Sequence, residues 1–160
     1  PWTSRSHRAS VVVNAEQGLC ASVHSGTLRQ VIYNLLRNAL TAIQATGRAP
    51  RPGDIEVQVT PASKGRGIRM RVIDKGIGIA ASRMSSLFEP FQSTSATPSR
   101  GLGLIMCRNA ITSFGGEIWC TSEEHIGTTF HIRLPLAPAG GSSPITIPAA
   151  LRSLDPRRWD

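Results

Sequence analysis

The sequence predicts an α/β fold in which strands and helices form a layered sandwich. Three observations lead to this prediction. Apolar and polar residues alternate along short segments, as they do in half-buried strands. Two longer segments, residues 25–46 and 101–114, are typical of helices that glycine residues end. The two kinds of segment alternate irregularly along 160 residues, which is the length of one ordinary domain.

Six short segments are predicted to be strands: residues 11–13, 19–23, 55–59, 68–73, 117–122 and 128–134. The first two of them flank a turn at residues 16–18. The third and fourth show the clearest alternation, and residues 64–67 between them contain the glycines of a hairpin turn. We therefore expect these two strands to pair with each other.

Glycine and proline residues mark the helix ends and the loops. Ser25 or Thr27 is expected to cap the first helix, and Gly47 to end it. A short polar helix should end near Leu87. Residues 89–100 contain two prolines and many serines and threonines, so we expect them to form a mobile loop.

The chain is expected to be a fragment of a longer protein, because it lacks an initiator methionine and a signal peptide. Residues 1–9 are interpreted as a lead-in from a missing upstream region. Residues 10–136 are interpreted as one domain, and residues 137–160 as a Gly/Ser/Pro linker with a disordered tail.

Composition argues against several classes of protein. No apolar run approaches the roughly 20 residues that a membrane span needs. The three cysteines are widely spaced, which argues against a disulfide framework or a zinc knuckle and fits a reducing compartment. The net charge of +8 comes mainly from scattered arginines, and aromatic residues are 5% of the chain, so a base-stacking nucleic-acid surface is not expected.

The first long helix carries two asparagines on one stripe. At ~100° per residue its apolar residues lie on one arc, and Asn34, Arg37 and Asn38 lie on the opposite side. Because Asn34 and Asn38 are four residues apart, their amides point the same way. Their carbonyl oxygens could bind a hard cation such as Mg²⁺. The alternative is an ordinary solvated helix face.

A glycine-rich segment follows the fourth predicted strand. Asp74 stands at the end of that strand, before Gly76 and Gly78, where its carboxylate could accept a hydrogen bond from an exocyclic amine such as adenine N6. An ordinary Asp-x-Gly turn is the alternative. Gly101 and Gly103 precede the second long helix, and the N-terminus of a helix binds phosphate well. The chain has no P-loop and no Rossmann fingerprint.

In this order the motifs resemble the ATP-binding catalytic domain of sensor histidine kinases, in the GHKL or Bergerat-fold superfamily. The resemblance covers roughly residues 10–136. It rests on an asparagine box (Asn34–Ala39), a first glycine box (Asp74–Ile79), a phenylalanine box (Leu87–Thr94), a second glycine box (Gly101–Leu104) and a closing strand pair at residues 115–130. It implies a two-layer sandwich of a mixed, mainly antiparallel sheet packed on about three helices.

The resemblance also implies a role for each matching residue. Asn38 would hold Mg²⁺ and Asn34 would assist at the phosphates, and these two are the expected catalytic residues. Asp74 would bind the adenine of ATP. The other expected ATP-binding positions are Arg37, Gly76, Gly78, Ile79, Phe88, Arg100, Gly101, Leu102, Gly103, Leu104 and Thr128. A plain surface role is the alternative for the two arginines, and core packing is the alternative for Phe88.

The residue one turn before the metal-binding asparagine separates classes within the superfamily. Hydrolytic members place a glutamate there as the general base for water. This chain has Asn34, and an amide cannot accept a proton at neutral pH. The resemblance therefore implies transfer of the γ-phosphoryl group of ATP to a histidine. That histidine is expected on a dimerisation domain of the parent chain, for relay to a response-regulator receiver domain, so the fragment alone should not autophosphorylate.

We expect the parent protein to be a homodimer and this soluble domain to lie in the cytoplasm, without a nucleic-acid partner. Membrane anchoring of the parent chain stays open. Ser95 and Ser99 depart from the family pattern. They are expected to weaken the binding of phosphate by the loop at residues 89–100, and they leave open a nucleotide-sensing variant with weak catalysis. Three different functions also stay open: a GHKL-type ATPase, a protein-serine kinase, and a nucleotide-free interaction or nucleic-acid-binding module that uses the positive charge.

Overall fold

The structure is a computed structural model that describes residues 11–63, 67–89, 102–137 and 145–146. Within these residues the helices are α1 (Ser25–Gln44), α2 (Ala81–Met84) and α3 (Gly103–Ser113). The strands are β1 (Val11–Ala15), β2 (Cys20–Ala21), β3 (Ile55–Pro61), β4 (Ile68–Asp74), β5 (Glu117–Glu123), β6 (Gly127–Leu134) and β7 (Ile145–Thr146). Among the described helices, none combines the length and the apolar character needed to cross a membrane.

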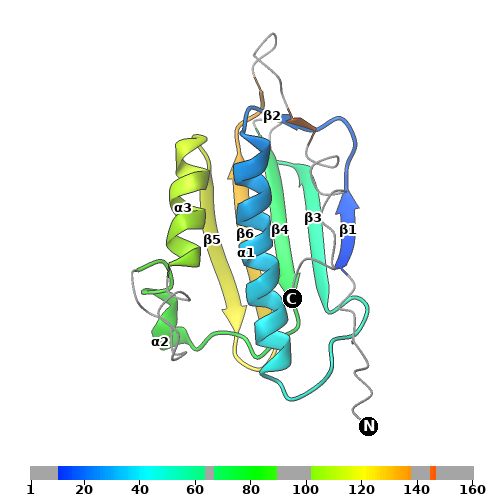
Figure 1. The fold of residues 1–160 in the computed structure, drawn as a ribbon, viewed down its shortest axis with the longest axis vertical. Coiled ribbons are helices and arrows are strands. Elements are labelled where there is room, and N and C mark those ends of the chain that lie inside the picture. The colour runs from blue at the N-terminus through cyan, green and yellow to red at the C-terminus, as the bar shows by residue number, and fades with distance from the viewer. Residues whose placement is uncertain (1–10, 64–66, 90–101, 138–144, 147–160) are drawn as a thin grey trace.

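A mixed sheet of five strands, in the order β1-β3-β4-β6-β5, forms one layer of the domain. Strand β1 runs parallel to β3, and the other neighbouring strands are antiparallel. Helices α1 and α3 lie side by side on one face of this sheet (Figure 1). The predicted two-layer α/β sandwich with a mainly antiparallel sheet is confirmed.

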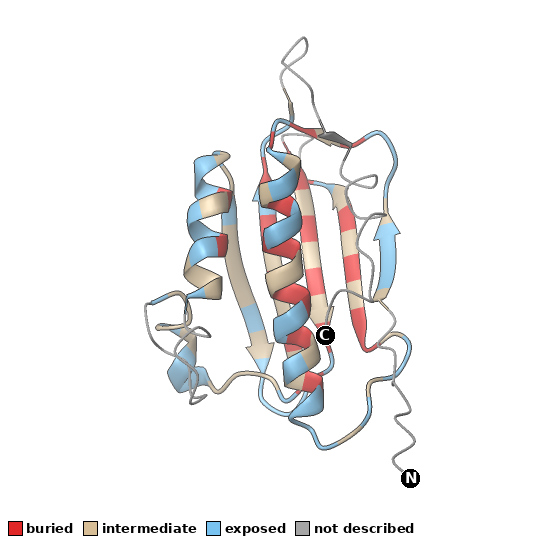
Figure 2. Cartoon of the chain, viewed as in Figure 1, coloured by how far each residue is buried: buried red, intermediate tan, exposed pale blue. Residues whose placement is uncertain are grey.

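The core lies between the sheet and α1. Alternate residues of β4, namely Ile68, Met70 and Val72, are buried because successive side chains of a strand point to opposite faces. In Figure 2 buried (red) and half-buried (tan) bands alternate along β4. Helix α1 buries one arc of side chains: Leu28, Val31, Ile32, Leu35, Leu36, Ala39 and Ile43. The apolar arc predicted for this helix therefore faces the core, with Leu40 at its half-buried edge.

The N-terminus of α1 differs from the prediction. The helix begins at Ser25, and its N-cap is His24 rather than Ser25 or Thr27. The Nδ1 atom of His24 accepts a hydrogen bond from the backbone N–H of Thr27 at 3.4 Å. An imidazole nitrogen thus fills the place usually taken by a hydroxyl or carboxylate oxygen.

The two strands predicted around the turn at residues 16–18 do not pair with each other. Strand β1 joins the edge of the large sheet beside β3, whereas β2 pairs with β7 in a separate two-stranded sheet. Local sequence patterns predict hairpins most readily, and they do not indicate that a strand pairs in parallel with another strand far along the chain.

Part of the segment interpreted as a linker contacts the domain. Ile145 and Thr146 form β7, antiparallel to Ala21 and Cys20 of β2. The backbone N–H of Ala137 also donates to the carbonyl of Cys20 at 3.1 Å. At these positions the structure differs from a free linker. Residues 138–144 and 147–160, the lead-in at 1–9 and nearly all of the loop at 89–100 lie outside the described residues.

Candidate nucleotide-binding site

Several of the residues expected to bind ATP meet at one end of the large sheet. There β4 ends at Asp74 and β6 begins at Gly127. The strand register places Asp74 opposite Thr128, and Thr128 opposite Ser122 of β5. Because Asp74 and Thr128 continue the buried rows of β4 and β6, their side chains point to the face that the helices cover.

Asp74 is a buried carboxyl group at this end, with 5% of its surface exposed. Its Oδ1 accepts a hydrogen bond from the backbone N–H of Gly76 at 2.9 Å. Burial raises the pKa of Asp74 from 3.8 to about 6, and backbone hydrogen bonds from Gly76 and Thr128 offset part of that effect. A buried carboxyl with a raised pKa is more typical of a binding site than of an ordinary turn.

Gly76 and Gly78 are required by contacts within the chain. A Cβ atom at Gly76 would lie 2.5 Å from the Cβ of Ala42 in α1. Gly78 has a φ of 69°, and a Cβ there would lie 2.1 Å from the carbonyl oxygen of Glu123. The two glycines therefore let this segment lie against α1 on one side and against the end of β5 on the other. This packing fixes the backbone from which Asp74 projects.

Ser122 links three parts of the site, although no motif predicted it. Its Oγ accepts a hydrogen bond from the backbone N–H of Ile79 at 2.9 Å and donates to the carbonyl of Gly127 at 2.8 Å. The hydroxyl of Thr128 lies 2.9 Å from the same oxygen. Ser122 thus connects the first glycine box to the start of β6, and the pairing of β5 with β6 is what brings it there.

Replacing Ser122 by alanine is expected to lower the free energy of unfolding by about 1–3 kcal/mol, because partly buried partners lose their hydrogen bonds. It should also weaken nucleotide binding, since Ile79 and Thr128 lose a common anchor. Urea unfolding and nucleotide titration measure the two effects. Ser113→Ala is the control, because the Ser113 hydroxyl donates to Ala110 in an exposed turn of α3. Equal stability of the two variants would contradict the linking role of Ser122.

The polar stripe of α1 passes close to α3. The side chain of Asn34 is half-buried, and its Nδ2 donates to the Sγ of Cys107 in α3 at 3.8 Å. The Nε2 of Gln30 lies 3.5 Å from the Oδ1 of Asn34. Arg37 and Asn38 are exposed on α1, so their side chains are accessible to a ligand.

The start of α3 carries the described part of the second glycine box. Leu102 is the N-cap residue and is exposed, Gly103 is the first helical residue, and no side chain caps this end. Leu104 is half-buried against the core. The backbone N–H groups of this turn are thus without a side-chain cap, as a phosphate site requires. Arg100 and Gly101 lie outside the described residues.

Phe88 of the phenylalanine box is half-buried and packs against the hydrophobic core. The guanidinium carbon of Arg108 in α3 lies 5.7 Å from the centre of its ring. Phe88 therefore attaches the chain before the second glycine box to the core and to α3. This contact accounts for an anchoring role, and nothing in it requires direct contact with a nucleotide.

The donors that α1 offers to a metal ion are amide oxygens. Among the described residues, no group of three or more His, Cys, Asp or Glu side chains could hold a metal ion. Asn34 and Asn38 supply neutral oxygen ligands, and Mg²⁺ in proteins usually keeps several waters and binds the phosphates of a substrate. The donor set fits an ion that arrives with a nucleotide better than it fits a resident metal.

Residues that support the site without belonging to a motif could not be predicted. Ala42 contacts Gly76, Cys107 contacts Asn34, and Ser122 contacts Ile79. Each of these pairs is formed by segments that lie far apart in the chain. The small size of Ala42, on the same stripe as Asn34 and Asn38, is the one local signal that could have indicated a close approach at this point.

Comparison with known proteins shows the family and the fold of the chain. Residues 24–138 match the family described as histidine kinase-, DNA gyrase B-, and HSP90-like ATPase. Sensor histidine kinase ZraS of Escherichia coli K12 is 37% identical over 109 residues, which cover 68% of this chain and 22% of ZraS. The C4-dicarboxylate transport sensor protein DctB of Rhizobium meliloti is 39% identical over 123 residues, covering 75% of this chain and 18% of DctB.

The fold matches a solved structure of similar size. The nucleotide-free catalytic domain of histidine kinase ThkA superimposes with a TM-score of 0.66 at 26% identity, covering 84% of this chain and 83% of that one. By contrast, the chain spans less than a quarter of the length of ZraS and DctB. The family match covers more than half of the chain, and the chain therefore belongs to the histidine kinase-, DNA gyrase B- and HSP90-like ATPase family, with sensor histidine kinases among its relatives.

Proposed function

We propose that this chain is the ATP-binding catalytic domain of a two-component sensor histidine kinase. It transfers the γ-phosphoryl group of ATP to a histidine on a dimerisation domain elsewhere in the parent protein. The observation that carries the proposal is the buried carboxyl of Asp74, which lies beside Gly76 where that segment contacts Ala42 of α1. The family match supports ATP as the ligand.

The spacing of residues along α1 supports one order for the parts of the nucleotide. Asn34, Asn38 and Ala42 follow one another at intervals of four residues, so each is about 6 Å further along the helix axis. Ala42 contacts Gly76, next to the adenine-binding Asp74, and Asn34 contacts Cys107, one turn into α3. A nucleotide whose adenine lies at Asp74 therefore extends its phosphates past Asn38 toward Asn34 and the start of α3.

Asp74 accepts a hydrogen bond from the exocyclic amine of adenine, and it does so as a carboxylate. Thr128 orients that carboxyl through its backbone hydrogen bond, and the adenine ring lies over the segment that Gly76 and Gly78 hold in place. The backbone N–H of Ile79, at the end of this segment, is held by Ser122. These residues bind and position the base, and they take no part in bond making.

The phosphate end of the site works by positioning and charge neutralisation. The Asn38 amide oxygen would hold Mg²⁺, and Asn34 would assist at the phosphates. The ion neutralises charge on the phosphate oxygens when it is bound. Uncapped N–H groups of α3 near Leu102, Gly103 and Leu104 donate to phosphate oxygens, together with Gly101. Arg37 and Arg100 add positive charge.

Asn34 also decides between transfer and hydrolysis. It occupies the position one turn before Asn38 at which a carboxylate would act as a general base, and an amide cannot take the proton of an attacking water. The chemistry therefore favours an acceptor that brings its own nucleophile, such as the imidazole of a histidine. The parent protein is proposed to be a homodimer with this domain in the cytoplasm, and to pass the phosphoryl group to a response-regulator receiver domain.

The test combines this chain with the dimerisation domain of its parent protein and ATP labelled at the γ-phosphate. We expect acid-labile, base-stable label on a histidine of the dimerisation domain, and almost no phosphate release by the chain alone. Steady ATP hydrolysis without an acceptor would indicate the hydrolytic class instead. Acid-stable label on a serine of a protein substrate would indicate a protein-serine kinase.

A further inference from the structure

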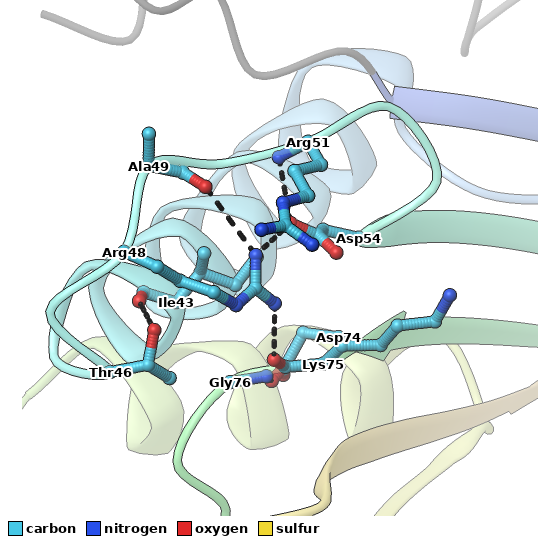
Figure 3. A network of polar contacts seen from close by, with 9 residues as sticks. All are labelled: Ile43, Thr46, Arg48, Ala49, Arg51, Asp54, Asp74, Lys75 and Gly76. Atoms are coloured by element: carbon cyan, nitrogen blue, oxygen red, sulfur yellow. Dashed lines mark hydrogen bonds and ion pairs between the residues drawn. The ribbon is translucent and has the colours of Figure 1, made fainter.

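The loop between α1 and β3 contacts the segment that follows Asp74. The loop itself belongs to none of the four boxes. Figure 3 shows Arg48 and Asp54 of this loop next to Lys75, which stands between Asp74 and Gly76. The Nη2 of Arg48 donates to the carbonyl oxygen of Lys75 at 3.0 Å. The backbone N–H of Lys75 donates to the carbonyl oxygen of Asp54 at 3.0 Å. Both backbone polar groups of Lys75 are therefore held by the loop.

Arg48 and Asp54 also hold each other. The Nη1 of Arg48 forms an ion pair with the Oδ2 of Asp54, which is buried at 7% exposure. The same oxygen accepts a hydrogen bond from the backbone N–H of Arg51 at 2.7 Å. The hydrogen bond from Arg48 lowers the pKa of Asp54, whereas burial opposes it, so this carboxyl stays ionised at neutral pH. Asp54 is thus a buried, ionised carboxylate that accepts a charge-assisted hydrogen bond from the half-buried guanidinium of Arg48.

The segment that carries Asp74 is thereby held from two sides. On one side Gly76 lies against Ala42, and the N–H of Ile77 donates to the Ala42 carbonyl at 3.1 Å. On the other side the loop holds Lys75. The N–H of Gly76, which belongs to the peptide bond that the Lys75 carbonyl begins, donates to Oδ1 of Asp74. Because the carbonyl and this N–H belong to one planar peptide unit, fixing the first orients the second.

We propose that Arg48 and Asp54 are positioning residues for adenine recognition. They act through the Lys75–Gly76 peptide, which orients the carboxylate of Asp74 toward the exocyclic amine of the base. The proposal rests on the function proposed above. Neither residue is proposed to contact the nucleotide. The two residues should therefore affect selectivity for the exocyclic amine and not the binding of the phosphates.

The test compares ATP with inosine triphosphate, which carries a carbonyl oxygen in place of the exocyclic amine and has the same ribose and phosphates. Dissociation constants for both nucleotides are measured by calorimetry on the wild-type chain and on Arg48→Ala. We expect the wild type to bind ATP more tightly than inosine triphosphate. In Arg48→Ala the ratio of the two dissociation constants should fall by about tenfold, mainly through weaker ATP binding, because a misoriented acceptor loses its hydrogen bond.

Two further variants separate positioning from general damage. Asp54→Asn keeps an oxygen for the N–H of Arg51 but removes the charge that holds Arg48, and it should lose a smaller part of the preference. Arg29→Ala removes the same charge from the opposite end of α1, where its side chain lies near Ser25, and it should leave the preference unchanged.

The outcomes distinguish this proposal from the function on which it rests. The positioning role alone is overturned if Arg48→Ala weakens the binding of ATP and of inosine triphosphate by the same factor. It is also overturned if both Arg48→Ala and Asp54→Asn keep the wild-type preference for ATP. Failure of the wild-type chain to bind ATP overturns both proposals.

Discussion

Replacing Asp74 by asparagine is expected to abolish detectable ATP binding and, at the same time, to raise the free energy of unfolding at neutral pH. Binding is lost because the amide presents a weaker acceptor and a competing donor to the exocyclic amine of adenine. Stability rises because the wild-type carboxylate is held in a buried place where its charge is poorly solvated.

The pH dependence of this gain follows from the pKa of Asp74, which burial raises from 3.8 to about 6. Between these values the folded state keeps a proton that the unfolded state has released, so the stability of the wild type falls as the pH rises. Above about pH 6 the buried carboxylate lowers the free energy of unfolding by its full amount, about 3 kcal/mol. Below pH 3.8 the carboxyl is neutral in both states and the cost disappears.

Urea unfolding of the wild type and Asp74→Asn at pH 7.5 and at pH 4 measures this effect, and titration with a fluorescent ATP analogue measures binding. The variant should be the more stable protein at pH 7.5, by up to about 3 kcal/mol, and should approach the wild type at pH 4. A variant that binds the analogue as well as the wild type does would remove Asp74 from the adenine site. A variant that is less stable at pH 7.5 would contradict the electrostatic account.

Replacing Asn38 by alanine is expected to slow phosphoryl transfer by on the order of 100-fold, because it removes the proposed metal ligand. The side chain of Asn38 is exposed and lies outside the core of α1, so the free energy of unfolding should change by less than about 0.5 kcal/mol. The loss of rate is then a loss of chemistry and not of folded protein. The rate of labelling of the acceptor histidine, measured beside a thermal unfolding curve, tests both statements.

Asn109→Ala is the matched control for this experiment, since Asn109 is an exposed asparagine of α3. It should transfer phosphate at the wild-type rate. A rate for Asn38→Ala within twofold of that control, at saturating Mg²⁺ and ATP, would show that Asn38 does not hold the metal ion.

The fold could be predicted because each main element has a strong local signal. The alternation in β3 and β4 and the apolar arc of α1 are imposed by burial on one face, and burial leaves a periodic pattern in the sequence. The parallel pairing of β1 with β3 and the pairing of β2 with β7 had no such signal, because neither pair is joined by a tight turn. His24 as the N-cap likewise departs from the usual preference for small polar residues.

The candidate site could be predicted as far as its motifs extend. Asp74, Gly76 and Thr128 lie together at one end of the sheet because strand register brings them there. The residues that hold these motifs in place could not be predicted in this way. Arg48 and Ser122 act through backbone groups, and any of several residues can satisfy a backbone group, so the sequence carries no distinctive pattern for such contacts.

The most direct test of the account is a crystal structure of this chain with a non-hydrolysable ATP analogue and Mg²⁺. We expect the exocyclic amine of adenine within hydrogen-bond distance of a carboxylate oxygen of Asp74, and a metal ion bridging the phosphates to the amide oxygen of Asn38. A base bound elsewhere, or phosphates that lie away from the stripe of Asn34 and Asn38, would contradict it.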